Sequence, residues 1–236
     1  MISLLRILLI CLALCPAALF AQQRKVQNKP FIDERRFHYG FFVGIHDETA
    51  QLVNNGYIDP ATGAQWVAQT DQMSLGFSVG VLGEWKLNRT LSLRAVPSLH
   101  FGSKHFTFKD QTTGKQEYQD LKSCYVGMPI DLKVAAPRFN NYRPYVVAGL
   151  APYYDLSGNE QGKLKFKPFT LMAEIGMGCD LYMPFFKLIP ELKFCFGLGN
   201  VLKKNRPDLI DPTQRIFTES VDRATVSMVV LTFYFE

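Results

Sequence analysis

The sequence predicts an all-β fold: an eight-stranded antiparallel transmembrane β-barrel, closed around a packed polar interior. The last residues, 224–236, alternate in character, with Val229, Leu231, Phe233 and Phe235 on one face of an extended strand. The chain is 47% hydrophobic and 13% aromatic, yet after the N-terminus it contains no run of about 18 apolar residues, the length that a membrane-spanning helix needs. Its apolar residues are therefore spread along strands.

The N-terminus predicts export. Arg6 precedes an apolar run at 7–20 that is too short for a comfortable membrane span and ends before Ala21. This pattern is typical of a secretory signal peptide, expected at residues 1–21 and removed from the mature protein. A polar arm at 22–36 then precedes a single barrel domain at 37–236.

Charge and cysteine content exclude several function classes. The formal net charge of +5 is mild, and no block of Lys and Arg resembles a nucleic-acid footprint, so no nucleic-acid partner is expected. Cys124, Cys179 and Cys195 remain after processing and include no CxxC pair, which indicates neither a disulfide framework nor a zinc site. We expect no metal, no cofactor and no small-molecule substrate.

The first four strands are expected at 37–46, 73–85, 90–101 and 121–135, each with apolar side chains at alternate positions. On the first strand these are Phe37, Tyr39, Phe41, Val43 and Ile45. On the second they are Leu75, Phe77, Val79 and Val81. On the third they are Leu91, Leu93, Ala95, Leu99 and Phe101, and on the fourth Val126, Met128, Ile130 and Leu132.

The last four strands are expected at 142–156, 169–182, 186–200 and 224–236. The first of them contains Pro144 and Pro152, each of which removes a donor from the strand ladder. In 186–200, five apolar residues face away from Lys187, Glu191 and Lys193. These five are Leu188, Leu192, Phe194, Phe196 and Leu198.

The connections between strands predict the orientation. Long polar connections are expected at 47–72, 102–120, 157–168 and 201–221, and short ones at 86–89, 136–141 and 183–185. Long and short connections therefore alternate, as in outer-membrane barrels, whose long loops face outside and whose tight turns face the periplasm. Both termini would lie in the periplasm, and the apolar face would contact outer-membrane lipid. Five aromatic residues are placed for the interfacial girdles: Tyr39, Trp85, Phe185, Phe186 and Phe235.

The opposite face collects charges of both signs. The inward-facing charged residues are Glu84, Arg94, Asp131, Lys133, Glu174, Asp180, Glu191 and Lys193. They could line a polar conduit. However, an eight-stranded barrel is just wide enough for its own side chains to fill, so we expect them to pair into a structural network that does not conduct.

His46 and His100 form the only enzyme-like group, near Ser98, Ser103 and His105 at the outer ends of two strands. An outer-membrane lipid-modifying enzyme could use such a His/Ser pair. No nucleophile motif surrounds these serines, so the sequence favours solvated rim histidines and a protein that is not an enzyme.

Several segments together resemble one family. They are NKPFIDERRFHYGFFVGIH at 28–46, VPSLHFGSK at 96–104, NNYRPYVVAG at 140–149, EIGMGCDLYMPFFKLIPELKFCFGLGNVL at 174–202 and the ending SMVVLTFYFE. They resemble the PorT family of outer-membrane barrels over essentially the whole mature chain. The likeness is more specific than one to OmpA- or OmpX-like barrels in general, because segments between strands agree too. The loop at 53–69 is individual to this chain.

The resemblance implies a role in the type IX, or Por, secretion system, which exports cargo proteins across the outer membrane and in some bacteria supports gliding motility. It supplies no catalytic residues. A barrel too narrow for folded cargo would act by contact with other type IX secretion components. A generic OmpX-like or adhesin-like surface barrel remains the alternative of the same class.

The polar arm is one candidate for that contact. Its charged residues are Arg24, Lys25, Lys29, Asp33, Glu34, Arg35 and Arg36. The arm is either a disordered leader or a docking segment for secretion components, because a closed barrel offers partners only its ends and its lipid face.

Overall fold

The computed structural model describes residues 26–60, 62–70, 74–157, 163–206 and 214–236. The expected signal peptide at 1–21 and the start of the arm, with Arg24 and Lys25, lie outside the described residues. Among the residues that are described, no helix combines the length and the apolar character needed to cross a membrane.

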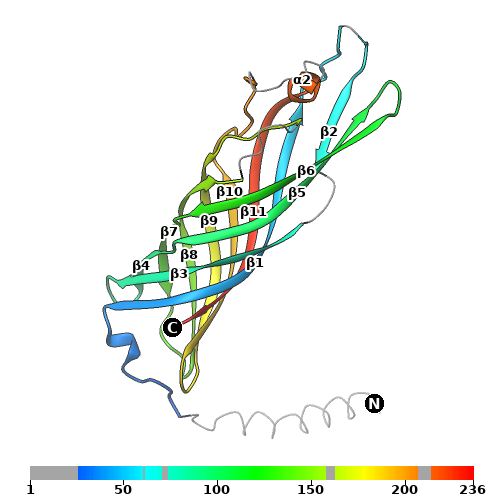
Figure 1. Cartoon of the computed structure of the whole chain (residues 1–236). Coiled ribbons are helices and arrows are strands. Elements are labelled where there is room, and N and C mark those ends of the chain that lie inside the picture. The colour runs from blue at the N-terminus through cyan, green and yellow to red at the C-terminus, as the bar shows by residue number, and fades with distance from the viewer. Residues whose placement is uncertain (1–25, 61, 71–73, 158–162, 207–213) are drawn as a thin grey trace, which may run out of the picture.

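The strands form one antiparallel sheet (Figure 1). Their bounds are β1 Phe37–Asn54, β2 Trp66–Thr70, β3 Leu75–Lys86, β4 Leu91–Ala95, β5 Ser98–Asp110, β6 Gln116–Gly127, β7 Ile130–Ala135, β8 Tyr142–Asp155, β9 Phe169–Tyr182, β10 Lys187–Gly197 and β11 Val221–Phe235. Two short helices accompany them, η1 Ile32–Glu34 and α2 Arg215–Glu219.

The pairings run around a ring, which confirms the predicted fold class. β1 pairs with β3 on one side and with β11 on the other, and β11 is followed by β10, β9 and β8. Two barrel strands complete the ring between β3 and β8. One consists of β4 followed by β5, and the other consists of β6 followed by β7. Each of these two pairs counts as one barrel strand, interrupted at Pro97 or Pro129, because proline cannot donate to the ladder. β2 pairs with the same edge of β5 as β3 does, and Ala68 of β2 exchanges two hydrogen bonds with the Asn54 side chain of β1. It therefore continues the position of β3 in the ring, between β1 and β5.

The three short connections lie where the sequence predicts them, but the predictions of two long connections are wrong. Residues 102–120 are not a loop: β5 and β6 continue as a hairpin that turns at 111–115. Within 47–72, β1 extends through Asn54 and β2 forms a further strand. We call the end of the barrel with this hairpin the hairpin end, and the opposite end, where the arm enters β1, the arm end.

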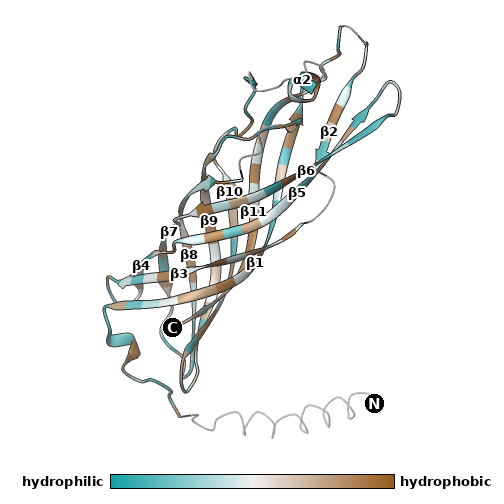
Figure 2. Ribbon diagram, viewed as in Figure 1, coloured by the Kyte–Doolittle hydropathy of each residue, from teal (hydrophilic) through white to brown (hydrophobic). Residues whose placement is uncertain are grey.

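The reason for both errors is that the barrel reverses its polarity along its length (Figure 2). Toward the arm end the outward side chains are apolar and exposed, as Phe41, Val43 and Ile45 are on β1. Further along the same strand, Thr49 and Gln51 take the outward positions. The apolar band therefore covers only part of each long strand, and the remainder, which we call the projecting part, has a polar exterior.

The projecting part has an apolar interior of its own. The ring of Phe217 lies 4.9 Å from those of Trp66 and Phe108, edge to face in both cases. Leu164 and Leu202 are buried in the same cluster. The connections 157–168 and 201–221, predicted to be polar loops, thus supply core residues.

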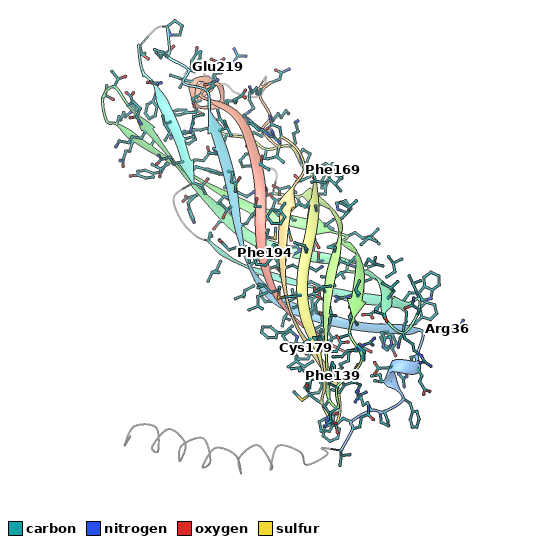
Figure 3. All side chains as sticks on the ribbon, turned by 180° about the vertical axis from the view of Figure 1, so that it is seen from behind. Arg36, Phe139, Phe169, Cys179, Phe194 and Glu219 are labelled. Carbon is teal, nitrogen blue, oxygen red and sulfur yellow. The ribbon has the colours of Figure 1, made fainter. Side chains whose placement is uncertain are left out.

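Aromatic side chains gather at the arm end. Phe37 stacks on Trp85 with ring centroids 6.1 Å apart, and Phe235 lies 5.2 Å from Phe41 and 6.0 Å from Phe186. Phe185 is 90% exposed. Figure 3 shows Arg36 and Phe139 at this end and Glu219 at the other. An exposed aromatic belt at one edge of the apolar band is the usual arrangement at a membrane interface.

Replacing Phe108 by alanine is expected to lower the free energy of unfolding by about 3 to 5 kcal/mol, because Phe108 is fully buried and its removal leaves a cavity. Equilibrium urea unfolding in lipid vesicles, followed by tryptophan fluorescence, measures this change. Tyr118→Ala, in the same hairpin but 64% exposed, is the control and should shift stability by no more than about 0.5 kcal/mol. Equal effects of the two substitutions would contradict an apolar core in the projecting part.

Candidate functional site

The eight predicted interior residues all point into the barrel and are buried. Glu84, the least buried, is 7% exposed, and Arg94 and Asp131 are 0% exposed. Strand alternation places them there, since each shares the parity of its inward-facing neighbours.

Arg94 occupies the centre of this interior. Its guanidinium Nη1 donates to Glu191 Oε2 at 2.5 Å, and its Nε lies 3.8 Å from Glu84 Oε2. Two tyrosine hydroxyls also donate to Glu191, Tyr145 at 2.5 Å and Tyr234 at 3.1 Å. Hydrogen bonds and opposite charge together offset part of the cost of removing these ions from water. Two other nitrogens of the Arg94 guanidinium, Nε and Nη2, are buried without a hydrogen-bond partner among the described residues.

Lys193 joins a second set of carboxylates. Its ammonium pairs with Asp131, lies 3.1 Å from Glu174 Oε2 and is 3.7 Å from Glu191 Oε1. Tyr153 donates to Glu174 at 2.9 Å. Glu191 therefore links the Lys193 group to Arg94.

Lys133 extends the network toward the arm end. Its ammonium lies 3.0 Å from Asp180 and 3.3 Å from Glu84. Lys187 then connects Asp180, at 3.9 Å, to Glu236, the last residue of the chain. The structure thus brings all eight predicted residues into one connected network.

Sequence reasoning missed several members of this network. They are Lys187, Glu236, His38, Tyr145, Tyr153 and Tyr234. The sequence predicts that Lys187 faces inward with Glu191 and Lys193, so only its place in the network was missed. The tyrosines are inward-facing residues on predicted strands, but their hydroxyl partners depend on pairing across the barrel.

A separate ion pair lies toward the hairpin end. Lys104 Nζ is 2.8 Å from Glu48 Oε1 and donates to the Tyr125 hydroxyl at 2.6 Å. Ser123 donates to Glu48 Oε2 at 2.9 Å. The sequence missed Glu48 and Lys104 because both fall in segments predicted to be loops.

His46 and His100 are not solvated rim residues. They are 2% and 3% exposed, and Ser78 lies between them, with its Oγ 2.7 Å from His46 Nδ1 and 2.8 Å from His100 Nδ1. Ser98 Oγ lies 3.0 Å from His100 Nε2. The prediction of rim histidines is wrong because β1 and β5 continue well past both residues. Ser103 and His105 lie further along β5 toward the hairpin end. There His105 Nδ1 is 2.6 Å from Asp120 Oδ1, and its Nε2 is 3.5 Å from Ser103 Oγ.

The interior beside these histidines is nearly filled. A cavity lined by Ser98, His100, Glu174 and Lys193, among others, has a volume of about 20 Å³. This space suits about one water molecule. It is too small for a lipid or a solute.

The described part of the arm is folded against the barrel, so a disordered leader is wrong for residues 26–36. Arg138, in the β7–β8 turn, donates to Lys29 O at 3.2 Å and to Asp33 Oδ2 at 3.3 Å, and also to Asn28 O. Its guanidinium lies 3.5 Å above the Tyr182 ring. Arg138 therefore clamps the arm to the end of the barrel.

Two further contacts fix the same segment. Asn28 Nδ2 donates to Tyr182 O at 2.9 Å, and the Tyr182 hydroxyl donates to Asp33 Oδ1 at 2.7 Å. Glu34, Arg35 and Arg36 remain exposed, and Phe31 is 71% exposed. We call these four residues the arm surface.

Within the projecting part, Glu117 holds one connection in place. Lys115 and Lys163 donate to its carboxylate at 2.8 and 2.9 Å, and these hydrogen bonds lower its pKa to about 2. The pair with Lys163 attaches the segment that follows β8 to β6. Throughout the described ranges, no group of three or more His, Cys, Asp or Glu side chains is placed to hold a metal ion.

Comparison with known proteins places the chain among outer-membrane barrels. The family described as "Outer membrane protein beta-barrel domain" matches residues 20–203. None of the curated proteins compared gives a significant match.

Three solved barrels illustrate the structural likeness. Neisserial surface protein A is 10% identical, with 85% of this chain and 98% of that chain covered and a TM-score of 0.42. OprG from Pseudomonas aeruginosa is 12% identical, with 84% and 92% covered and a TM-score of 0.42. Ail from Yersinia pestis, in complex with a heparin analogue, is 12% identical, with 85% and 99% covered and a TM-score of 0.36. Likeness at this level carries no argument about function.

Glu191→Ala is expected to cost about 3 to 5 kcal/mol of stability, because it leaves Arg94 buried without its nearest carboxylate. Urea unfolding measures the loss, and planar-bilayer recording should detect no channel. The control is Asp222→Ala, which removes an exposed pair with Lys204 and should cost about 1 kcal/mol or less. Unchanged stability together with a new ion conductance would instead favour a conduit.

Ser78→Ala tests the buried histidine pair. It removes the hydroxyl between His46 and His100 and should destabilise the barrel by about 1 to 3 kcal/mol, the cost of leaving buried polar atoms unpaired. Ser227→Ala, on β11, is the matched control and should be close to neutral. Mass spectrometry of outer-membrane lipids should find no difference between wild type and variant. Loss of a lipid modification would support the enzyme alternative.

Proposed function

Because this chain belongs to the outer membrane protein beta-barrel domain family, we propose that it is a non-enzymatic component of the type IX protein secretion system, needed for the export of cargo proteins and, where the cell glides, for motility. The PorT-like segments at 28–46, 96–104, 140–149 and 174–202 and the PorT-like ending of the chain support this assignment.

The observation that carries the mechanism is the filled interior. Arg94, Lys133 and Lys193 each contact carboxylates inside the barrel and are almost completely buried. A barrel in this state offers cargo no passage. It acts by assembling or stabilising other secretion components.

In the proposed orientation, the arm end lies in the periplasm. The short connections 87–90, 136–141 and 183–186 lie at this end, as tight turns do on the periplasmic side of outer-membrane barrels. The C-terminus lies at the same end (Figure 1), where Glu236 pairs with His38 and Lys187. Residues 1–21 are the cleaved signal peptide in this scheme.

The arm surface is the proposed docking site for secretion partners. It combines an exposed aromatic ring, Phe31, with the charges of Glu34, Arg35 and Arg36. Exposed aromatic and arginine side chains are enriched at protein interfaces. The clamp by Arg138 holds this surface in a fixed position, which lowers the conformational entropy lost on binding.

A generic surface barrel and a lipid-modifying enzyme are the two alternatives to this function. A generic surface barrel is favoured by the projecting part, which would extend a folded structure beyond the outer leaflet. A lipid-modifying enzyme using His46 and His100 has little support, because both rings are sealed within the barrel.

The test replaces the arm surface without disturbing the clamp. In a strain lacking the wild-type gene, Phe31→Ser/Arg35→Ser/Arg36→Ser should insert normally into the outer membrane but reduce secreted cargo at least about fivefold, as expected for the loss of more than 1 kcal/mol of contact energy. Immunoblots of the culture medium measure secretion, and heat-modifiable gel mobility reports folding.

The matched control is Tyr57→Ser/Ile58→Ser, at the opposite end of the barrel, where Ile58 is 58% exposed. It should leave secretion unchanged. If the arm variant secretes normally and the control variant does not, the working surface lies outside the cell. If neither affects secretion and a gene deletion also has no effect, the type IX assignment is wrong.

A further inference from the structure

The carboxylates around Lys193 outnumber the cations that they contact. The Lys193 ammonium pairs with Asp131 and lies 3.1 Å from Glu174 Oε2. It is also 3.7 Å from Glu191 Oε1. Glu191 has a closer partner of its own, because Arg94 Nη1 lies 2.5 Å from its Oε2. Lys193 is therefore left to compensate two carboxyl groups, those of Asp131 and Glu174, which we call the carboxylate pair.

The other cations of the network do not supply the missing charge. Lys133 lies 3.3 Å from Glu84 and 3.0 Å from Asp180. Lys187 lies 3.9 Å from Asp180. Among the residues that these ion pairs link, the carboxylates are Glu84, Asp131, Glu174, Asp180 and Glu191, and the cations are Arg94, Lys133, Lys187 and Lys193. One carboxylate therefore has no cation of its own.

Glu236, the further partner of Lys187, is balanced by His38. His38 Nδ1 pairs with the Glu236 carboxylate, and His38 Nε2 lies 3.2 Å from Arg35 O. Both ring nitrogens thus face oxygen acceptors. Because a backbone carbonyl and an ionised carboxylate can only accept, the ring donates from both nitrogens and carries a positive charge. This imidazolium and Glu236 form a neutral pair at the arm end.

The two members of the carboxylate pair differ in how their oxygens are used. Glu174 Oε1 accepts from the Tyr153 hydroxyl at 2.9 Å and lies 3.4 Å from Cys195 Sγ. Glu174 Oε2 accepts from Lys193. Asp131 Oδ2 also accepts from Lys193, but Asp131 Oδ1 is buried without a hydrogen-bond partner among the described residues. Asp131 is 0% exposed, so an ionised Oδ1 would have neither bulk water nor a donor.

The sheet register places the two carboxyl groups next to each other. Gly149 on β8 lies opposite Asp131 of β7 on one side and opposite Glu174 of β9 on the other. A Cβ atom at position 149 would lie 2.4 Å from Asp131 Oδ1, so the glycine leaves the space that this carboxyl group fills. Two buried carboxyl groups that share one ammonium repel each other when both are ionised, which favours a proton on one of them.

We propose that the carboxylate pair binds one proton in the folded barrel, held by Asp131, while Glu174 stays ionised beside Lys193. The proton is taken up from water as the barrel closes around the pair, and it removes the one negative charge that the network leaves uncompensated. A neutral carboxyl group costs much less to bury than an unpaired carboxylate. This proton does not depend on a role in secretion, because it follows from the barrel interior alone.

The strands packed against the pair carry other charged and titratable groups. They are Arg94 on β4, His100 on β5, Tyr153 on β8, Glu191, Lys193 and Cys195 on β10, and Tyr234 on β11. Tyrosine and cysteine side chains are ordinarily neutral at neutral pH. The ring nitrogens of His100 lie 2.8 Å from Ser78 Oγ and 3.0 Å from Ser98 Oγ, so they face hydroxyl groups and not a carboxylate. The surplus negative charge therefore lies on the carboxylate pair.

The test compares the mature wild type with Asp131→Asn by urea unfolding in lipid vesicles. Measurements at about pH 5.5, 6.5 and 7.5 cover a range in which unfolded aspartate is ionised. The folded wild type then holds one proton more than its unfolded chain, so its stability decreases as pH rises. Asparagine mimics the neutral carboxyl group and releases no proton. The unfolding equilibrium constant of the wild type should therefore rise about tenfold per pH unit relative to that of the variant.

Asp180→Asn is the matched control, because Asp180 contacts two lysines, Lys133 and Lys187. It should be less stable than the wild type by a factor that does not change with pH, since Asp180 is ionised in both the folded and the unfolded chain. A ratio between the wild type and Asp131→Asn that stays constant with pH would overturn the bound proton.

Infrared spectroscopy of the folded barrels gives a second readout that needs no unfolding. The C=O band of a neutral carboxyl group should be present in the wild type and in Asp180→Asn. It should be absent from Asp131→Asn and from Glu174→Gln, because either substitution leaves a single carboxylate beside Lys193. Absence of the band from the wild type, or its persistence in Asp131→Asn, would contradict a proton on Asp131.

Discussion

The structure depends on the pairing of charges inside a ring that its own side chains nearly fill. Where the barrel faces lipid, closure satisfies the backbone donors and acceptors, and every second side chain must point inward. Here those side chains include charges of both signs, and each removal from water costs several kcal/mol unless a partner compensates. The contacts of Arg94, Lys133 and Lys193 with Glu84, Glu191 and Asp180 supply that compensation.

The reversal of polarity follows from a change of surroundings at constant strand geometry. Outside the apolar band, water replaces lipid, so outward positions become polar. The strands then need an apolar interior to hold them together, and Trp66, Phe108 and Phe217 provide it. One continuous strand such as β1 thus belongs to two different cores. The two cores meet where β8 stops and β6 continues.

Parity explains both what the sequence predicts and what it misses. In β11, Val229, Leu231, Phe233 and Phe235 are the outward positions near the arm end, whereas Ala224, Val226 and Met228 are buried at the opposite parity. In β5, Leu99 and Phe101 face outward, but Phe106 and Phe108 face inward. If a strand is taken to end where apolar residues stop at one parity, it is predicted too short. The alternation continues beyond that point, with apolar residues at the other parity. Following both parities would have found the hairpin, which contains Lys104, and the extension of β1, which contains Glu48.

The remaining differences required contacts that no local pattern contains. Nothing at Arg138 or Tyr182 in the sequence indicates that they hold the arm, since Asn28 and Asp33 lie more than a hundred residues away. The burial of His46 and His100 likewise depends on Ser78 and on strands that extend beyond them. These contacts bear directly on function: they close the interior at the histidines and give the arm a fixed surface at one end. The contacts with partners that we propose are thereby left to the lipid face and to the two ends of the barrel.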